Sequence, residues 1–583
     1  MCDRSFMLKI TIQLLAMSCV MASAAEGIAW QDLNADTLAK ARAEKKLVFL
    51  DLEAVWCHWC HVMDAKTYSD PDVQAALEKG FISAKVDADS RPDLAKRYED
   101  YGWPALVELD PVTLEERAIG SGFQTKEEFL ALLAKTDGGK VTTIPNTNKV
   151  SQTGTLDEKQ RKVLIDKLRN RYDKQETGWG TGSKFVPWNN IEYCIRLDRA
   201  GDSGTRQMAE DTLAAGTGLI DPVWGGVYQY STHGDWVHPH FEKIMQFQAE
   251  ISRAYALAYQ AWKRPADLKA AEDIAGYLNH FLRSPEGAYY VSQDADVVPG
   301  EHSEGYFAKS EQERRAIGIP RVDTHVYSRE NGMAVCALVA VYQATGKRSY
   351  LDDATKAARW IIENRSISGG GFSHDARDPY GPFLADQVSM GRAMLALYQA
   401  TADKQWLDRS ASCANFTIGR FSRVEVAGAG FLTAAQHENV PPPVADLDEN
   451  IEMARWLNLL GRTTGEQNFI HAAAHAMRYL ASDAVIDSIF SFTGGLQLAD
   501  EEIRNEPVHI GIVGKKDDPA ARALFDAAQS HPSSYKIIEW IAKGGNGTNF
   551  PSLDRAAAFL CTEKTCSSPK FGAQELSESF SKH

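Results

Sequence analysis

Cysteine is scarce in this sequence, with nine residues among 583. Two of the nine fall within the first 24 residues, and the other seven are too few for disulfides to build the scaffold. A hydrophobic core must therefore hold the fold, and a chain of this length can bury a large one. Three cysteines lie in apolar, helix-patterned segments, and we expect them to be inert buried thiols: Cys194, Cys336 and Cys413.

Long hydrophobic runs and an excess of basic residues are also missing. Beyond residue 24, no stretch reaches the roughly 18 consecutive apolar residues of a membrane-spanning helix. Lys and Arg total 63 against 78 Asp and Glu, which gives a net charge of −15. Because nucleic acids and anionic membranes repel an acidic chain, we exclude both as partners.

The first 24 residues have the composition of a secretory signal peptide. Arg4 and Lys9 give a positive start, residues 10–21 are apolar, and Ala22-Ser23-Ala24 offers a small-residue cleavage site. We therefore expect residues 1–24 to be a signal peptide and the protein to be secreted or periplasmic. Lipid attachment at Cys19 is a minor alternative, because the residues before it fit that pattern poorly.

Cys57 and Cys60 form a Cys-x-x-Cys motif in the most informative segment of the chain. The preceding residues 46–52 have the pattern of a buried strand, and residues from about 60 to 77 have the pattern of a helix. A strand, a Trp-Cys-x-x-Cys turn and a helix together are typical of thioredoxin-like domains. At such a helix start, backbone N–H groups and the helix dipole favour a thiolate on the first cysteine.

The segment after the motif supports the same fold. Residues 80–87 read as a second strand, 93–101 as a short helix, and the residues after Pro104 as a third strand. Thioredoxin-like folds place a cis-proline before this strand, facing the disulfide, and Pro104 is the candidate. Residues 26–137 are therefore expected to be a thioredoxin-like domain.

This motif has three possible uses. For redox exchange, Cys57 would be the exposed nucleophile, Cys60 would resolve the mixed disulfide, His58 would favour the thiolate, and Pro104 would help to bind substrate. Zinc binding by Cys57, His58, Cys60 and His61 is less favoured, because one short segment cannot easily place four tetrahedral ligands. The motif could also be an inactive disulfide, since fold does not imply function. We expect no metal and no cofactor.

Beyond a polar linker at 138–155, the sequence changes to long amphipathic helices. The periodicity predicts helices at about 157–172, 189–200, 205–218, 241–262, 266–282, 329–345, 350–364, 383–401, 404–418, 446–462 and 467–481.

Glycine–aromatic segments recur between these helices. They are Gly178-Trp179-Gly180, Trp224-Gly225-Gly226-Val227-Tyr228, Gly287-Ala288-Tyr289-Tyr290, Gly369-Gly370-Gly371-Phe372, Gly428-Ala429-Gly430-Phe431 and Gly494-Gly495-Leu496. Six such units favour an all-α (α/α)6 toroid over residues 156–505, since the turns resemble those of six-hairpin glycosidases and sugar epimerases. An open helical solenoid is the alternative.

The last stretch, residues 506–583, reads as a small α/β appendage. Strand patterns at 508–514 and 535–541 flank a helix pattern at 518–530. In an exported protein, Cys561 and Cys566 are candidates for a structural disulfide, although exchange with the Cys57–Cys60 pair is an alternative.

The toroid carries its own set of candidate catalytic residues. Carboxylates on one face could act as general acid and base on a glycosidic bond, or histidines could move a proton at a sugar carbon. The alternative is that Asp and Glu near helix starts are ordinary caps. The candidates are His238, His240 and Glu242, expected at a helix start, with Asp294, Asp296, Glu304 and Asp386.

These motifs together resemble the spermatogenesis-associated protein 20 family. The resemblance rests on Cys57 to Met63, Gly102-Trp103-Pro104, residues 225–243, and the blocks Gln293 to Asp296 and Glu304 to Phe307. It implies a thioredoxin-like domain joined to a six-hairpin, glycosidase-like toroid. The chain departs from the family at Ile244-Met245-Gln246-Phe247, where relatives continue with Met-Leu-Tyr-Asp.

We therefore expect a multidomain protein acting as an exported thiol–disulfide oxidoreductase at Cys57 and Cys60. Its partner would be a protein thiol or disulfide. The alternative is a carbohydrate-active or carbohydrate-binding toroid, a glycoside hydrolase or sugar epimerase by analogy, with the thioredoxin-like domain as a docking or regulatory module. A third hypothesis is a non-enzymatic scaffold in which both sites are vestigial.

Overall fold

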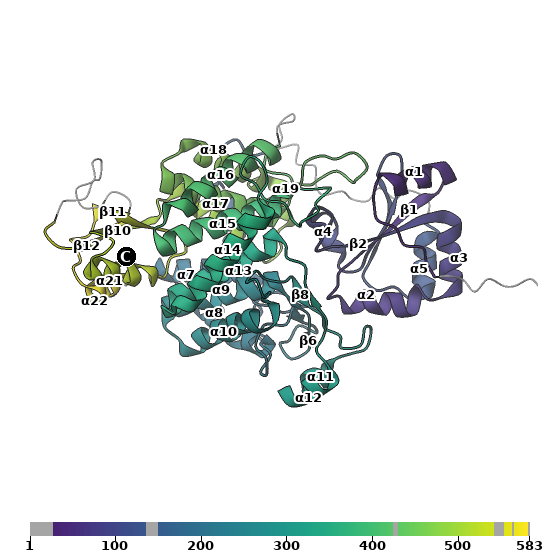
Figure 1. Cartoon of the computed structure of the whole chain (residues 1–583), viewed down its shortest axis with the longest axis horizontal. Coiled ribbons are helices and arrows are strands. Elements are labelled where there is room, and N and C mark those ends of the chain that lie inside the picture. The colour runs from purple at the N-terminus through teal and green to yellow at the C-terminus, as the bar shows by residue number, and fades with distance from the viewer. Residues whose placement is uncertain (1–26, 136–149, 424–428, 542–552, 563–564, 581–583) are drawn as a thin grey trace, which may run out of the picture.

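A computed structural model describes residues 27–135, 150–423, 429–541, 553–562 and 565–580. The expected signal peptide and most of the expected linker lie outside these residues. The chain forms an α/β domain, a large helical domain and a small mixed sheet, in the order expected from the sequence (Figure 1). No helix in the described ranges is long and apolar enough to cross a membrane.

The N-terminal domain is built on a four-stranded sheet with order β2-β1-β3-β4. The central strand β1 pairs in parallel with β2 and antiparallel with β3, which pairs with β4. The Trp103–Pro104 peptide bond before β3 is cis, as predicted. The elements are α1 (Ala35–Glu44), β1 (Leu47–Glu53), α2 (His58–Val62), α3 (Pro71–Gly80), β2 (Phe81–Asp87), α4 (Pro92–Tyr98), β3 (Ala105–Leu109), β4 (Glu116–Ser121) and α5 (Lys126–Leu133).

The prediction of a single helix from about residue 60 to 77 is wrong. Helix α2 continues as a π-helical turn, Met63–Thr67, and the chain then bends before α3 begins at Pro71. Pro71 occupies the first turn of α3, where its missing N–H costs nothing, and the Asp70 side chain accepts a hydrogen bond from the N–H of Asp72. The apolar periodicity runs through this break and hides it.

Within the described residues, twelve helices form a closed double ring. Each of six inner helices contacts the next, and the last contacts the first, so the ring is a toroid and not an open solenoid. The inner helices are α7 (Trp188–Arg199), α9 (Met245–Trp262), α13 (Ser328–Thr345), α15 (Leu384–Thr401), α17 (Leu447–Thr464) and α20 (Gly494–Arg504). The outer helices are α6 (Glu158–Asn170), α8 (Ser203–Gly216), α10 (Pro265–Tyr277), α14 (Arg348–Arg365), α16 (Lys404–Phe421) and α18 (Gln467–Leu480). Since α6 packs against α20, the first and last helices together make the sixth hairpin.

A repeated amide contact explains the glycine–aromatic turns. Near the start of an inner helix, one buried Asn or Gln bonds both the N–H and the C=O of a residue in the preceding turn, which satisfies backbone groups that would otherwise be buried without partners. The pairs are Gln248 with Val227, Asn331 with Tyr289, Gln387 with Phe372 and Asn450 with Phe431.

Two sequence expectations about the toroid are wrong. The helix expected from residue 241 begins at Met245, so His238, His240 and Glu242 precede it in irregular chain and in the short strand β6 (Pro239–His240). Gly494-Gly495-Leu496, expected as a turn, is the first turn of α20. A Cβ on Gly494 would lie 2.3 Å from the backbone oxygen of Asn189, so close packing of two helices accounts for this glycine.

The C-terminal domain is a four-stranded mixed sheet with order β11-β10-β12-β13. Cys561 and Cys566 are joined by a disulfide between adjacent strands of this sheet. The elements are β10 (Val508–Val513), α21 (Pro519–Gln529), β11 (Lys536–Ile541), β12 (Ala557–Thr562), β13 (Thr565–Cys566) and α22 (Ala573–Ser579). Figure 1 shows this domain and the thioredoxin-like domain at opposite ends of the ring.

Candidate functional site

The two cysteines of the motif form a disulfide at the start of α2. Cys57 is the N-cap of this helix, and its Sγ accepts a hydrogen bond of 3.1 Å from the N–H of Cys60. A hydrogen bond to sulfur is stronger when the sulfur is a thiolate, so this position favours an ionised Cys57 in the reduced state.

The disulfide is enclosed, which contradicts the expectation of an exposed Cys57. Only 3% of Cys57 and 2% of Cys60 is accessible to solvent. Ile244 and Phe247 of the toroid pack with the motif in one apolar cluster. The sequence could not reveal this, because the two segments are far apart in the chain and the cover forms only when the domains dock.

One toroid carboxylate binds both histidines of the motif. Nδ1 of His58 lies 2.8 Å from Oδ1 of Asp296, and Nδ1 of His61 lies 3.2 Å from Oδ2 of the same carboxylate. Burial opposes the charge on Asp296, but the hydrogen bonds from His58 and His61 outweigh it and lower the pKa of Asp296 to about 2. These contacts join the thioredoxin-like domain to the toroid.

Asp294 lies beside this pair and has a different environment. Its Oδ1 accepts a hydrogen bond from the N–H of Asp296, and its Oδ2 lies 3.8 Å from Nε2 of His61. Burial raises the pKa of Asp294 to about 7, against the attraction of His61. The same two carboxylates also affect His61. Burial disfavours the charge on its ring, but Asp296 and Asp294 outweigh burial and raise the pKa of His61 above the ordinary value.

In the part of the chain that the structure describes, three groups of side chains have the composition and spacing to hold a cation. Within each group, the potential ligand atoms lie within 4.8 Å of one another: His61 with Asp294 and Asp296, Asp51 with Glu53 and Asp64, and His233 with Asp235 and His238. The zinc alternative for the motif requires Cys57 and Cys60 as thiolates. Because the two sulfurs are bonded to each other, they are not available as ligands in this form.

A second polar network joins the domains beside the disulfide. Nε1 of Trp56 donates to Oδ2 of Asp89 at 2.7 Å, and Arg329 of the toroid lies 3.3 Å from Oδ1 of Asp89. His374 lies between the two domains, with Nε2 at 2.8 Å from the Asp89 carbonyl and Nδ1 at 2.9 Å from Asp386. Asp386, proposed from the sequence as catalytic, is thus buried in a docking contact.

The other candidate residues do not converge on one point. His240 stacks on Tyr230 at 4.5 Å, and its Nδ1 lies 3.8 Å from the buried carboxylate of Glu242. His238 is exposed and pairs with Asp235. Glu304 is exposed at the start of the short helix α11 (Glu304–Phe307). Asp294 and Asp296 of the toroid set lie against the histidines of the motif, and the charge of Glu242 adds to the effect of burial in raising the pKa of Asp294.

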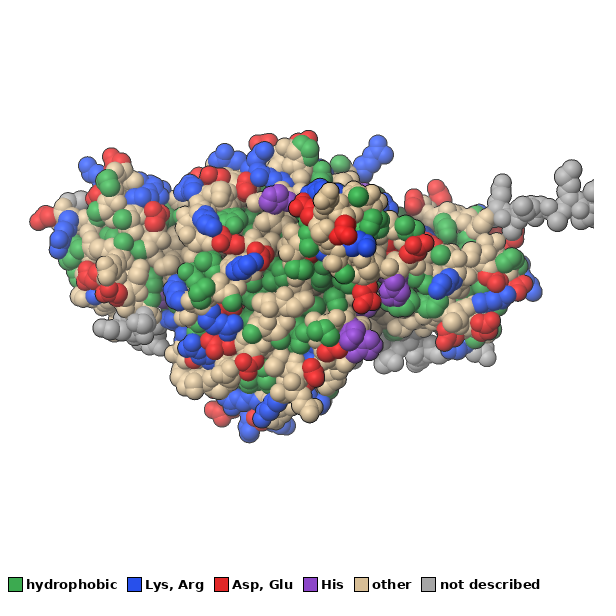
Figure 2. Space-filling view, turned by 90° about the horizontal axis from the view of Figure 1, so that it is seen from below, with side chains coloured by type: hydrophobic (Ala, Val, Ile, Leu, Met, Phe, Trp, Pro, Cys, Tyr) green, Lys and Arg blue, Asp and Glu red, His purple; other side chains and the backbone are tan. Residues whose placement is uncertain are grey.

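His302 and Trp59 also lie at this interface. The ring of His302 lies 4.7 Å from the ring of His58 and 6.4 Å from that of Trp59. Trp59, which is 37% exposed, therefore borders the domain junction. Figure 2 shows histidine side chains on the surface near this junction. No local pattern marks the residues of the second network as interdomain contacts, because each partner is remote in sequence.

Stability of the docked state will depend on pH through His374. Burial disfavours its charge, but Asp386 outweighs burial and raises the pKa of His374 to about 9. A histidine with a raised folded-state pKa contributes stability below its unfolded value of about 6.5, and this contribution is lost as pH rises through about 9. The difference in unfolding free energy between the parent and His374→Gln will shrink by about 3 kcal/mol between about pH 6 and pH 10.

Urea unfolding at several pH values measures this difference. His325→Gln is a control, because His325 also binds an aspartate, Asp323, but is exposed. A pH-independent difference for His374→Gln would contradict the assignment of a buried imidazolium.

Comparisons with known proteins match parts of this chain. A family model named Thioredox_DsbH and described as "Protein of unknown function, DUF255" matches residues 15–111. Spermatogenesis-associated protein 20 of Homo sapiens is 28% identical over 311 residues, which cover 46% of this chain and 39% of that protein. An uncharacterized protein of Caenorhabditis elegans is 25% identical over 462 residues, covering 68% and 63%. The predicted resemblance to the spermatogenesis-associated protein 20 family is confirmed.

The match is partial: the chain spans about two fifths of the length of the human relative. Thiol:disulfide interchange protein DsbD 2 of Pseudomonas aeruginosa is 38% identical over 84 residues, 14% of each chain. Among solved structures, D-mannose isomerase is 12% identical with a TM-score of 0.46, covering 60% of this chain and 96% of that chain. A cellobiose 2-epimerase from Spirochaeta thermophila is 10% identical with a TM-score of 0.46, covering 59% and 97%.

Proposed function

Since the chain resembles spermatogenesis-associated protein 20 and has a Cys-x-x-Cys disulfide, we propose that it is a thiol–disulfide oxidoreductase acting through Cys57 and Cys60. The observation that carries the proposal is the bonded pair at the N-terminus of α2. Two features support it: the N–H of Cys60 donates to the Cys57 sulfur, and a cis-proline, Pro104, precedes β3. The names of the DsbD relatives agree with this chemistry.

The exchange proceeds in two balanced steps. A substrate thiolate attacks Sγ of Cys57, the Cys57–Cys60 bond breaks, and Cys60 leaves as a thiolate while a mixed disulfide forms. A second substrate thiolate then attacks the substrate sulfur of the mixed disulfide and releases Cys57. The substrate pair loses two electrons and the protein gains them; the reverse sequence oxidises the protein.

Access to the sulfurs sets the kind of partner. Because Ile244 and Phe247 pack against the motif, a folded protein cannot reach Cys57 in the docked arrangement. Either the partner is a small thiol, or the Asp296 contacts separate before exchange. The toroid then acts as a cover whose opening controls the rate of exchange.

The reduction potential of the Cys57–Cys60 pair tests the proposal. The full chain is equilibrated with glutathione buffers, and free thiols are trapped for mass spectrometry. A reversible couple between about −270 and −120 mV is expected, the range of known exchange proteins, and its value distinguishes a reductant from an oxidant. A pair that does not oxidise, or a disulfide that resists reduction throughout this range, would contradict the proposal.

We further propose that the protein works in an exported compartment. The basic and apolar pattern of residues 1–24 supports this, and so does the disulfide between Cys561 and Cys566, because such bonds persist in oxidising surroundings. Cell fractionation with an antibody against the C-terminal domain tests the assignment. Recovery of the full-length, uncleaved chain with cytosolic markers would contradict it.

A further inference from the structure

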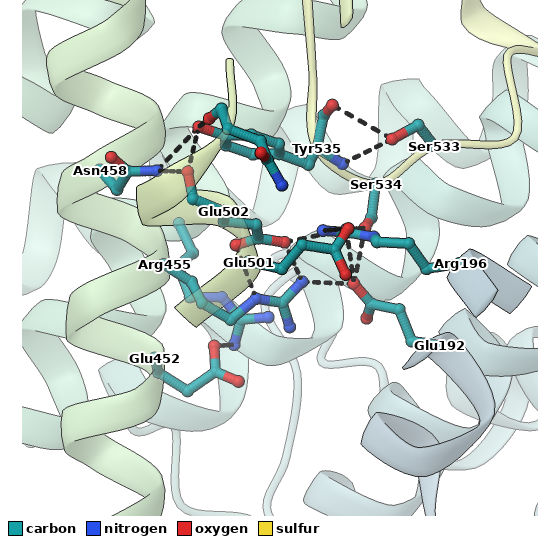
Figure 3. Close-up of polar contacts among 12 residues, drawn as sticks. Glu192, Arg196, Glu452, Arg455, Asn458, Glu501, Glu502, Ser533, Ser534 and Tyr535 are labelled. Atoms are coloured by element: carbon teal, nitrogen blue, oxygen red, sulfur yellow. Dashed lines mark hydrogen bonds and ion pairs between the residues drawn. The ribbon is translucent and has the colours of Figure 1, made fainter. Parts of the chain in front are cut away.

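A second polar site lies at the end of the ring opposite to the disulfide. A cavity of about 150 Å³ is lined by residues from the later turns of inner helices α9, α13, α15 and α17. Glu502 of α20, with Ser534, Tyr535 and Lys536 of the C-terminal domain, completes the lining. Figure 3 shows Ser533, Ser534 and Tyr535 above the charged side chains of the inner helices.

The charged groups of the ring pair with one another around this cavity. Arg455 binds Glu502 with two bonds of 3.0 Å and also contacts Glu192. Arg253 donates from Nη1 to Glu192 at 2.6 Å and from Nε to Glu250 at 2.8 Å. The carboxylates of Glu192, Glu250 and Glu502 are therefore already paired with guanidinium groups. Figure 3 shows Arg455 beside Glu192 and Glu502.

Two cationic side chains line the same cavity, and each has at least one N–H donor that is not bound by a carboxylate. Arg253 is only 8% exposed, and its buried Nη2 has no hydrogen-bond partner. Lys536 is 2% exposed, and its Nζ donates to the carbonyls of Gln529 and His531; no carboxylate among the described residues pairs with it. Burial, followed by the nearby charge of Arg199, lowers the pKa of Lys536 to about 7. A bound anion would accept the free N–H of Arg253 and would offset the positive charge of Lys536.

Part of the remaining lining is apolar, beside polar groups such as Gln343 and Gln399. Leu257, Val339, Leu395 and Trp456 face the cavity from four different inner helices. Cavities of about this volume hold a molecule of the size of benzene. A ligand here therefore needs a small apolar body and one anionic group, the usual composition of a buried ligand site.

We propose that this cavity binds a small organic carboxylate, recognised by Arg253 and Lys536. A carboxylate fits better than a neutral ligand, because it compensates the buried ammonium of Lys536 and accepts the free N–H of Arg253. The proposal is independent of the redox function, since the cavity lies at the other end of the ring. It also gives the C-terminal domain a role, because Lys536 belongs to that domain.

Packing of the C-terminal domain fixes the position of Lys536. Gln529, which precedes it, is held by three glutamines of the ring: its carbonyl accepts from Gln260, its side-chain oxygen accepts from Gln343, and its amide donates to the carbonyl of Gln399. The ammonium of Lys536 donates to the same Gln529 carbonyl. The site therefore exists only when this domain is docked on the ring.

Calorimetric titration of the full chain with two probe carboxylates, benzoate and lactate, tests the proposal. Benzamide and lactamide are the neutral controls of matched shape. At least one carboxylate is expected to bind, and its amide to bind about tenfold more weakly or not at all. The bound carboxylate will also raise the melting temperature, since it binds only the folded state.

Lys536→Met will weaken carboxylate binding by about tenfold or more while keeping the length of the side chain. Lys516→Met is the control, because Lys516 in the same domain also donates to a backbone carbonyl, that of Ala402, but does not line the cavity. Failure of both carboxylates to bind at about 10 mM would overturn the proposal and leave a water-filled cavity. Equal affinity for carboxylate and amide, or an unchanged affinity in folded Lys536→Met, would overturn it as well.

Discussion

Replacing Cys57 with Ser will abolish thiol exchange. The substitution removes the sulfur that accepts the N–H of Cys60 and that forms the mixed disulfide. Loss of a covalent nucleophile lowers a rate by orders of magnitude, so exchange with glutathione will fall by about a thousandfold or more. The measurement follows oxidation or reduction of glutathione by the full chain under fixed buffer conditions.

Two further variants make the result specific. Cys60→Ser will accumulate a mixed disulfide between Cys57 and glutathione, visible as one adduct per chain by mass spectrometry, because the resolving thiol is missing. Cys413→Ala, which removes a buried free cysteine in α16, will leave exchange unchanged. Retained exchange in Cys57→Ser would show that the activity belongs to another site.

Replacing Asp296 with Ala will expose the disulfide to protein partners. Asp296 binds both His58 and His61, and charge-assisted hydrogen bonds are each worth about 1.5–3 kcal/mol. Their loss favours separation of the domains. Reduction of the disulfide by a protein reductant, such as thioredoxin, will therefore accelerate by about tenfold to a hundredfold. Reduction by dithiothreitol, a small thiol, will change much less.

Asp235→Ala is the matched control for this experiment. Asp235 makes a similar contact of 2.7 Å to Nδ1 of His238, but this pair is on the surface of the toroid and does not join the domains. The ratio of the two reduction rates is the readout. If Asp296→Ala leaves this ratio unchanged, the toroid does not control access to the disulfide.

Local patterns predicted most of the fold. The periodicity placed the helix 329–345 within one residue of α13 (Ser328–Thr345), because an amphipathic helix records its buried face every three or four residues. The cis bond before Pro104 and the strands around it followed from a motif whose parts are close in sequence. The break before Pro71 was missed, since a proline in the first turn does not disturb the apolar pattern.

The candidate site was predicted only in pieces. Cys57, His58 and Asp296 were each singled out, yet nothing in the sequence joined His58 to Asp296, which lie 238 residues apart. Phe247 packs with Cys57 in one apolar cluster and lies within the segment where this chain departs from the family that it resembles. Such contacts form when the domains dock, and they produce no repeating sequence pattern in either domain.

Closure of the ring by α6 and α20 has a consequence for the order of events during synthesis. Domains fold from the N-terminus as the chain emerges, and the ring cannot close until Arg504 has been added. The thioredoxin-like domain is thus complete while its cover is still being made. The bond between Cys57 and Cys60 can therefore form before the finished toroid encloses it.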